Sequence, residues 1–367
     1  MKFLDSLLHR FNQPADYEKK SLFKIGHVLG SGSYGEVREA VIISTGQKCA
    51  MKAIKKSAVA GHEELVKSEM EVVGRLDHPN IIKLYDHFES RDKYYMVFEL
   101  ATGGELFDRI INQGKFTEKD GRGHIQTVLG AIAYLHERNI VHRDLKPENL
   151  LFRDDYPTSE LLLADFGICK EIDTGDQAMS TICGSFGYTA PEIMLRKKYG
   201  REVDLWSLGV ITYTLLCGYT PFPMDDQARF LDQARHGRVE FHSRYWKDIS
   251  DEAKAFIKQL LDPVPANRGN ATELLSHAWF VSSTATDVDL ISNVREGFNA
   301  RGMLTKGVNA ILMVNRMKRS SIESAAKLGV KPGAGMDAES KKDADDEEVD
   351  ESEPTESAPI KASTTAT

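Results

Sequence analysis

The local pattern of the sequence changes once, near residues 99–104, and this change limits what the chain can fold into. Upstream of it, short runs rich in Val, Ile, Phe and Tyr predict strands; downstream, longer apolar periods predict helices. Because strands come first and helices follow, we expect an α+β chain of two lobes, a small β-rich lobe and a larger helical one. The predicted strands lie at 23–29, 36–42, 48–54, 81–88 and 94–100. The predicted helices lie at 63–76, 123–138, 204–217 and 251–261.

Length and cysteine content are those of an ordinary globular protein. The 367 residues can bury one large core or two modest ones, which suits two lobes. No uninterrupted apolar run reaches about 18 residues, so no transmembrane segment is expected, and the first residues carry neither a secretory signal nor a myristoylation glycine. The four cysteines show no CxxC spacing, and we expect them to be free thiols. Free thiols suit a reducing compartment, so we expect the protein in the cytoplasm and also in the nucleus.

Negative charge is concentrated near the C-terminus. The formal net charge is −8, but residues 337–356 alone contain eleven acidic side chains and two lysines, so the rest of the chain is close to neutral. A nearly neutral remainder predicts no nucleic-acid surface. Small and acidic residues dominate from 322 to 367, and we expect a disordered acidic tail there.

Residues 1–21 form an N-terminal extension in which apolar residues recur at helical spacing. We interpret this stripe as one face of a short amphipathic helix docked on the folded body, with a membrane or partner contact as the alternative. The stripe consists of Phe3, Leu4, Leu7, Leu8 and Phe11.

A glycine-rich segment lies between the first two predicted strands. Glycines let backbone amides approach phosphate oxygens without an intervening Cβ. A hairpin turn would look similar, but the segment lacks the Gly-Lys-Ser/Thr ending of a P-loop, and no helix follows it as in a dinucleotide-binding fold. The segment consists of Gly30, Ser31, Gly32, Ser33, Tyr34, Gly35, Glu36 and Val37.

Lys52 lies within an apolar predicted strand, where an ammonium group is unfavourable unless it is paired. Glu69, on the following predicted helix, is one candidate partner. Glu63, Glu64 and Glu71 lie on the same helix, so spacing alone does not choose among them. A lysine that reaches the surface is the alternative.

The strongest local signal is the segment 141–149, which places an acid, a cation and an amide within six residues, as Asp144, Lys146 and Asn149. Phosphoryl transfer uses such a set: a carboxylate orients the attacking hydroxyl, a lysine reaches the γ-phosphate and an amide oxygen binds a metal ion. Asp165, 21 residues beyond Asp144, adds a second hard oxygen ligand suited to Mg²⁺. With the glycine-rich segment and the strand lysine, these residues predict a site for a nucleotide and a metal ion.

These motifs together resemble the protein kinase signature, from about Leu22 to Phe280. The resemblance implies the two-lobed protein kinase fold, with an N-lobe over 22–100 and a C-lobe over 101–280, and it implies ATP and Mg²⁺ as cofactors. Because no essential group is missing, a nucleotide-binding scaffold without activity is the weaker alternative.

The resemblance also implies a role for each motif residue. The catalytic set would be Asp144 as base, Lys146, Lys52 on the α- and β-phosphates, and Glu69 paired with Lys52. The metal ligands would be Asn149 and Asp165. Nucleotide contacts beyond residues 30–37 would come from Leu29, Ala50, Glu99, Ala101, Glu105 and Leu151, with Phe98 as the gatekeeper.

Further positions concern how the catalytic loop is supported and whether the acceptor is serine, threonine or tyrosine. By the same resemblance, Glu192 pairs with Arg268, and residues 204–209 support the catalytic loop from below. The residues at positions 146 and 185, Lys146 and Ser185, resemble those of serine/threonine kinases rather than those of tyrosine kinases.

Several stretches, among them 103–110 and 277–280, resemble the calcium/calmodulin-dependent kinases, and type I in particular. The resemblance implies that Glu105 binds an arginine three residues before the acceptor, giving an Arg-x-x-Ser/Thr preference for protein substrates. It also implies that an upstream kinase phosphorylates Thr181, whose phosphate could pair with Arg143.

Residues 285–321 are interpreted as an autoinhibitory and calmodulin-binding segment that runs back over the C-lobe and the substrate cleft. No acidic residue lies between Gly297 and Ser321, and apolar residues fall along one side of a helix, as in targets of Ca²⁺/calmodulin. An ordinary helix packed on the C-lobe, in a basophilic kinase without calmodulin control, is the alternative. The anchors would be Leu304, where type I kinases usually have tryptophan, Val308, Ile311 and Met317.

Overall fold

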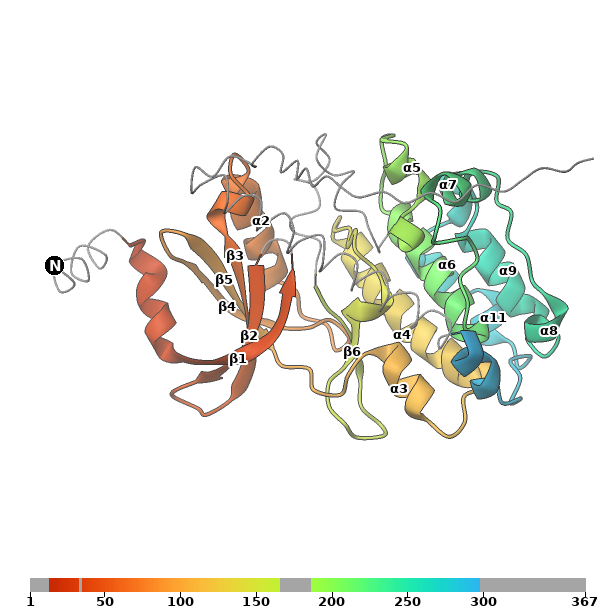
Figure 1. Ribbon diagram of the computed structural model, residues 1–367, viewed down its shortest axis with the longest axis horizontal. Helices are drawn as coiled ribbons and strands as arrows, with labels where there is room; N and C mark the ends of the chain where they lie inside the picture. The colour runs from red at the N-terminus through yellow and green to blue at the C-terminus, as the bar shows by residue number, and fades with distance from the viewer. Residues whose placement is uncertain (1–12, 33–34, 166–185, 298–367) are drawn as a thin grey trace, which may run out of the picture. The chain divides into compact units, whose positions relative to one another are not determined.

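The structure is a computed structural model that describes residues 13–32, 35–165 and 186–297 (Figure 1). Its N-lobe is built on an antiparallel sheet with the strand order β1-β2-β3-β5-β4. The strands are β1 (Phe23–Gly32), β2 (Gly35–Ile42), β3 (Lys48–Lys55), β4 (Leu84–Glu89) and β5 (Lys93–Glu99). The helices of this lobe are η1 (Ala15–Leu22), η2 (Lys56–Ala58) and α2 (Glu63–Gly74).

The 3-10 helix η1 lies against β4, an edge strand of the sheet. The Asp16 carboxylate accepts a hydrogen bond from the Glu89 amide at 3.1 Å, and the Gln13 side chain accepts one from the Arg91 amide at 2.8 Å. These contacts pair backbone groups that an edge strand would otherwise leave open to another chain. The described part of the N-terminal extension thus docks on the N-lobe, whereas the apolar stripe within residues 3–11 lies outside the described residues.

The helix α2 packs against the sheet through an apolar face. Val66, Met70 and Val73 recur at helical spacing and are buried. The helix ends at Gly74, two residues before the predicted end at residue 76, at a residue with low helix propensity.

The C-lobe is mainly helical, as predicted. Its helix α6 is apolar on all sides, and every residue from Val203 to Cys217 is buried, as expected for a helix at the centre of a core. The helices are α3 (Leu106–Asn112), α4 (Glu118–Glu137), η3 (Pro147–Asn149), η6 (Phe186–Tyr188), α5 (Pro191–Met194), α6 (Glu202–Cys217), α7 (Gln227–Arg235), α8 (Ser243–Trp246), α9 (Asp251–Leu260), η7 (Pro265–Arg268), α10 (Ala271–Leu274) and α11 (Ala278–Val281). A short hairpin is formed by β6 (Leu150–Phe152) and β7 (Leu161–Leu163).

The strand predicted over 81–88 is divided between the two lobes. Its second part forms β4, whereas Ile81 and Ile82 meet β7 of the C-lobe. The Ile82 amide donates to the Leu163 carbonyl at 3.0 Å, and the Leu163 amide donates to the Asn80 carbonyl at 2.9 Å. These bonds connect the N-lobe to the hairpin that carries Leu151 and lies next to Asp165.

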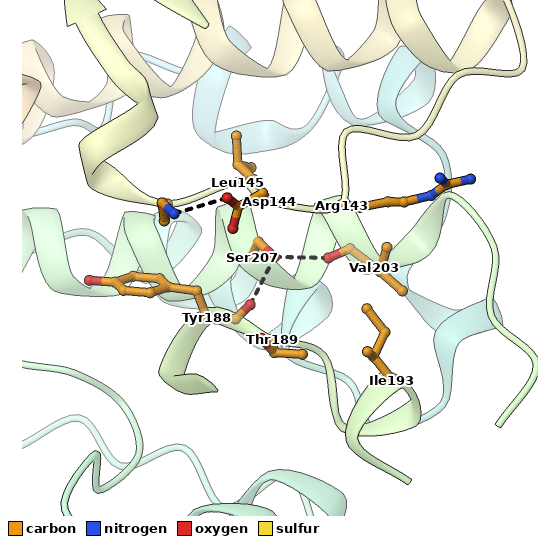
Figure 2. A pocket seen from close by; sticks show the side chains of 9 residues that line it. Arg143, Asp144, Leu145, Tyr188, Thr189, Ile193, Val203 and Ser207 are labelled. Carbon is orange, nitrogen blue, oxygen red and sulfur yellow. Dashed lines mark hydrogen bonds and ion pairs between the residues drawn. The ribbon is translucent and has the colours of Figure 1, made fainter. Parts of the chain in front are cut away.

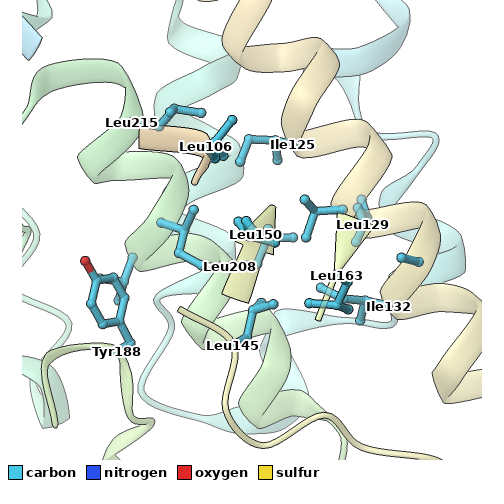
Figure 3. Close-up of a cluster of buried hydrophobic side chains, with 14 of the residues drawn as sticks. Leu106, Ile125, Leu129, Ile132, Leu145, Leu150, Leu163, Tyr188, Leu208 and Leu215 are labelled. Atoms are coloured by element: carbon cyan, nitrogen blue, oxygen red, sulfur yellow. The ribbon is translucent and has the colours of Figure 1, made fainter. Parts of the chain in front are cut away.

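The C-lobe core forms where α3, α4, α6 and the β6–β7 hairpin meet (Figure 3). Its side chains belong to segments far apart in the sequence, so the catalytic loop between α4 and η3 is anchored by packing from both sides. Buried residues drawn there include Leu106, Ile125, Leu129, Ile132, Leu145, Leu150, Leu163, Tyr188, Leu208 and Leu215.

Residues 282–297, which follow α11, contact the C-lobe. The buried Glu118 carboxylate accepts hydrogen bonds from the Ser250 amide at 3.0 Å, the Trp279 indole at 2.9 Å and the Thr286 amide at 3.2 Å. A buried carboxylate needs such donors, because it has lost its water. Glu118 therefore ties the segment after α11 to the start of α4.

The following turn and the helix over 291–297 are also packed on the C-lobe. Leu290 and Val294 are buried, and the Leu290 amide donates to the Phe116 carbonyl at 2.7 Å. A Cβ on Gly297 would lie 2.3 Å from the carbonyl oxygen of Gly218, so the two backbones touch at the end of α6. The helices in the described ranges are too short or too polar to span a lipid bilayer.

Candidate active site

The catalytic loop is held from below by one buried carboxylate. Asp204, at the start of α6, accepts hydrogen bonds from the backbone amides of His142 at 2.8 Å and Arg143 at 2.9 Å. Arg143 has a positive φ of 65°, an unfavourable conformation for a residue with a Cβ, and these bonds help to maintain it. The predicted support from residues 204–209 is confirmed at this position.

His136 also contacts Asp204, a residue pair that sequence reasoning missed. The imidazole Nε2 lies 2.9 Å from Asp204 Oδ2, and both side chains are buried. Burial alone would raise the pKa of Asp204, but the hydrogen bonds from His136 and His142 outweigh it and hold the pKa below its usual value. Asp204 is therefore an anion at physiological pH. His136 belongs to no recognisable motif, so no sequence signal pointed to this role.

The His142 side chain contacts the backbone of Asp144, two residues later in the same loop. Burial lowers the pKa of the His142 imidazole, so the ring is neutral at physiological pH. Nε2 lies 3.1 Å from the Ala164 carbonyl and must carry the ring proton, which leaves Nδ1 to accept the Asp144 amide at 3.3 Å. The buried ring thus links the Asp144 backbone to the segment that carries Asp165.

Asp144, Lys146 and Asn149 converge as the sequence predicts. Lys146 Nζ lies 2.9 Å from Asp144 Oδ2, and Asn149 Nδ2 donates to the Asp144 carbonyl at 2.7 Å. Burial would lower the pKa of Lys146, but the Asp144 carboxylate outweighs it and raises the pKa, so the lysine is fully charged. The result is a carboxylate and an ammonium group fixed side by side.

A small pocket lies next to Asp144 (Figure 2). It joins the catalytic loop to the segment that follows the undescribed residues 166–185. The Ser207 hydroxyl donates to the Tyr188 carbonyl at 2.8 Å and so fixes that segment to α6. The lining residues are Arg143, Asp144, Leu145, Lys146, Tyr188, Thr189, Ile193, Val203 and Ser207.

Lys52 and Glu69 are not paired with each other in this structure, so the predicted Lys52–Glu69 contact is wrong for this conformation. Lys52 Nζ makes its ion pair with Asp165, and Glu69 Oε1 lies 3.4 Å from Arg143 Nη1. The physical reason is the orientation of α2, which directs Glu69 toward the catalytic loop instead of toward β3. Each of these ionic groups still has a partner of opposite charge.

The glycine-rich loop and the apolar residues predicted to enclose a nucleotide lie on neighbouring strands. Val37 on β2 pairs with Lys52 on β3, and Ala50 on β3 pairs with Phe98 on β5. A Cβ on Gly35 would lie 1.8 Å from the Ala53 carbonyl oxygen, so only glycine fits there. The strand pairing thus brings the phosphate and adenine candidates together on the adjacent strands β2, β3 and β5, in the interior of the sheet.

The hinge between the lobes is fixed by an ion pair that the sequence did not reveal. Glu99, at the end of β5, is buried and lies 2.9 Å from Arg153, which follows β6. Nearby, a Cβ on Gly103 would lie 2.0 Å from the Asp154 carbonyl oxygen, so the hinge backbone passes against the hairpin. Ala101 is packed against the core between these two points.

Glu105 lies just beyond the hinge, at the N-terminus of α3. A single β-bridge joins it to Leu151 on β6, which places the predicted substrate-binding acid beside a predicted nucleotide contact. Burial, together with the negative charges of Asp108 and Glu148, raises the pKa of the Glu105 carboxyl. A cation bound there would relieve this repulsion.

The predicted Glu192–Arg268 pair is confirmed. Arg268 is fully buried, and its guanidinium group contacts both Glu192 oxygens, at 2.6 and 2.9 Å. The guanidinium carbon also lies 4.9 Å from the centre of the Trp206 ring. This bidentate ion pair fixes the end of the activation segment to the helical lobe.

Several predicted residues lie outside the described part of the chain. They are Ser33 and Tyr34 of the glycine-rich loop, Thr181 and Ser185 of the activation segment, and the anchors Leu304, Val308, Ile311 and Met317.

Comparison with known proteins identifies the family. Residues 23–280 match the protein kinase domain. The calcium/calmodulin-dependent protein kinase cmkA of Emericella nidulans is 50% identical over 318 residues, which cover 87% of this chain and 76% of that protein. The type I enzyme of Schizosaccharomyces pombe is 42% identical, over 81% of this chain and 90% of that protein.

A solved structure agrees with this result. Rad53 1-466, crystallised in complex with AMP-PNP, superposes with a TM-score of 0.62 and 35% identity, over 76% of this chain and 70% of that chain. The two-lobed fold predicted from the sequence is therefore confirmed. The chain belongs to the protein kinase family, as a serine/threonine kinase of the calcium/calmodulin-dependent group.

Proposed function

We propose that this kinase transfers the γ-phosphate of ATP to serine and threonine side chains of proteins, with Asp144 as the base that orients the acceptor hydroxyl. The observation that carries the proposal is the convergence of Asp144, Lys146 and Asn149 on one loop. Lys146 lies 2.9 Å from the Asp144 carboxylate, close enough to neutralise charge on a phosphoryl group transferred beside Asp144.

The residues present fit Mg²⁺. Asn149 Nδ2 donates to the Asp144 carbonyl, which orients the amide so that its oxygen is the group available to a cation. Asp165 adds a carboxylate oxygen, and hard oxygen ligands with few protein contacts suit Mg²⁺ bound together with phosphates. When bound, the ion would neutralise phosphate charge, while Asn149 and Asp165 would hold it.

Substrates with an arginine three residues before the acceptor suit this site. The pKa of Glu105 is raised first by burial and second by the negative charges of Asp108 and Glu148. The positive charge of an arginine side chain would stabilise the ionised Glu105 carboxylate against both effects. A guanidinium group can bind a carboxylate through two parallel hydrogen bonds.

Glu105→Gln is expected to lower kcat/KM for an Arg-x-x-Ser peptide roughly tenfold, because a charged hydrogen bond becomes a neutral one. The measurement is steady-state phosphorylation of that peptide and of a matched peptide with alanine in place of the arginine. The alanine peptide is the control and should respond little to the substitution. An equal loss with both peptides would place Glu105 outside arginine recognition.

Phosphorylation of Thr181 by an upstream kinase is proposed to raise activity through Arg143. In the described structure Arg143 pairs with Glu69, the residue that the resemblance to kinases assigns to Lys52. A phosphate carries more negative charge than a carboxylate, so it would compete for Arg143 and free Glu69 to turn toward Lys52.

Thr181→Ala is expected to keep basal activity and to lose a gain of roughly tenfold that the upstream kinase gives the wild-type chain. Peptide-kinase activity is measured before and after treatment, and the modified residue is located by mass spectrometry. Ser180→Ala, which removes the neighbouring hydroxyl, is the control and should retain the gain. Stoichiometric phosphate on Thr181 without a change in activity would contradict the proposal.

Control by Ca²⁺/calmodulin is proposed for the segment beyond Gly297. Relatives that cover most of this chain carry calmodulin dependence in their names. The segment is basic, carries regularly spaced apolar residues and directly follows a helix that is packed on the C-lobe. A cytoplasmic and nuclear location would suit such a regulator.

A further inference from the structure

A second ion pair on α2 lies outside the catalytic machinery. Lys67 Nζ lies 3.0 Å from Glu89 Oε1 at the end of β4. The Glu89 carboxylate is well anchored, because its other oxygen contacts Lys56, and η1 holds its backbone amide through Asp16.

The charges of this pair are coupled. Burial would raise the pKa of Glu89, but Lys56 and Lys67 outweigh it and lower the pKa, while the Glu89 carboxylate raises the pKa of Lys67. Both groups are therefore ionised at physiological pH, and the contact is a true ion pair at the end of the sheet.

Helix geometry relates this pair to catalysis. Lys67 and Glu69 are two positions apart, about 200° around a helix of 3.6 residues per turn. They therefore leave α2 on opposite sides of its buried face, which Val66, Met70 and Val73 form. Turning α2 so that Glu69 moves toward Lys52 on the sheet moves Lys67 away from the sheet, and hence away from Glu89.

We propose that the Lys67–Glu89 ion pair restrains α2 in the rotation seen here, and that Lys67 is a positioning residue that limits how often Glu69 reaches Lys52. The restraint opposes the active arrangement because turning Glu69 from Arg143 toward Lys52 would draw Lys67 away from Glu89. Its loss shifts the population of α2 toward the state in which Glu69 pairs with Lys52. This inference rests on kinase activity alone and does not depend on calmodulin.

Lys67→Gln is expected to raise basal kcat about two- to fivefold, the range that a partly exposed ion pair can supply, and to leave the KM for the peptide unchanged. Activity is measured on the 367-residue chain with chelator present. Lys67→Arg keeps the charge and should behave as wild type. Lys48→Gln is the matched control, because it breaks an exposed 3.2 Å ion pair with Glu39 on the same sheet without touching α2.

A double substitution separates positioning from a structural effect. If Lys67 acts through Glu69, the gain from Lys67→Gln disappears in a Glu69→Gln background, where no carboxylate is left to move. Thermal unfolding checks that the variants are equally folded. Unchanged or reduced activity of a folded Lys67→Gln, an equal gain in Lys48→Gln, or a gain that persists in the Glu69→Gln background would overturn the proposal.

Discussion

Asp144→Asn is expected to lower kcat roughly a thousandfold, within the range that a positioned base contributes. Asparagine has the size of aspartate and can keep the backbone contacts of Asp144 with His142 and Asn149, so the loop should stay folded. It cannot accept the proton of the acceptor hydroxyl, and its contact with Lys146 is no longer ionic. The measurement is peptide phosphorylation at saturating ATP.

Two controls separate lost chemistry from lost structure. Asp155→Asn makes the same chemical change on an exposed turn after β6 and should leave kcat unchanged. Thermal unfolding with and without ATP should show that the Asp144 variant folds and still gains stability from the nucleotide. Turnover of this variant near that of wild type would remove Asp144 from the role of base.

The residues of the catalytic loop could be predicted because they lie close together in the sequence. Asp144, Lys146 and Asn149 fall within one short segment, so any fold that makes this segment a loop brings them together. Arg268 and Glu192 are far apart, and only the resemblance to kinases paired them. His136 and Glu118 carried no such signal, because their partners come from distant helices that tertiary packing alone brings near.

The ends of helices and strands also depend partly on local sequence and partly on tertiary contacts. The start of α4 was predicted at residue 123 and lies at Glu118, because the Thr117 hydroxyl and the Asp120 carboxylate cap the helix reciprocally. Gly121 and Gly123 lower the helix propensity of this first part of α4, so a helix start there is weakly signalled by the sequence. The predicted strand at 81–83 was diverted by pairing with β7, a contact between lobes that periodicity does not encode.

The Lys52–Glu69 pair could not be settled from the sequence for a different reason. Both residue types suit the pair, and both lie on the predicted elements, but the contact depends on how α2 is turned. The same sequence can place Glu69 against Arg143 or against Lys52, and the two arrangements differ by a few ionic contacts. The motif identifies the residues that can form ion pairs, and the rotation of α2 determines whether Glu69 pairs with Lys52 or with Arg143.

The position of a truncation decides whether it tests regulation or stability. Leu290, Ile291 and Val294 are buried on the C-lobe, and Thr286 donates to the buried Glu118. A chain cut after Ser283 would lose these contacts and is expected to be less stable by several kcal/mol, since a single large-to-small core substitution costs about 2–5 kcal/mol. The informative cut therefore follows Gly297, the last described residue.

A chain that ends at Gly297 is expected to be active with chelator present, at about a hundredfold the level of the 367-residue chain, which should reach the same level only with Ca²⁺/calmodulin. The reason is competition: if residues beyond Gly297 occlude the site in about 99 of 100 molecules, calmodulin must favour the open state by about 5.5 kcal/mol to reverse the population. Peptide-kinase activity of both chains is measured with Ca²⁺/calmodulin and with chelator.

Leu304→Asp in the 367-residue chain replaces an apolar anchor with a charge, and it should weaken calmodulin binding and leave the enzyme inhibited. Equal activity of the two chains in chelator would mean that the segment does not inhibit, and the kinase would then be a basophilic enzyme without calmodulin control.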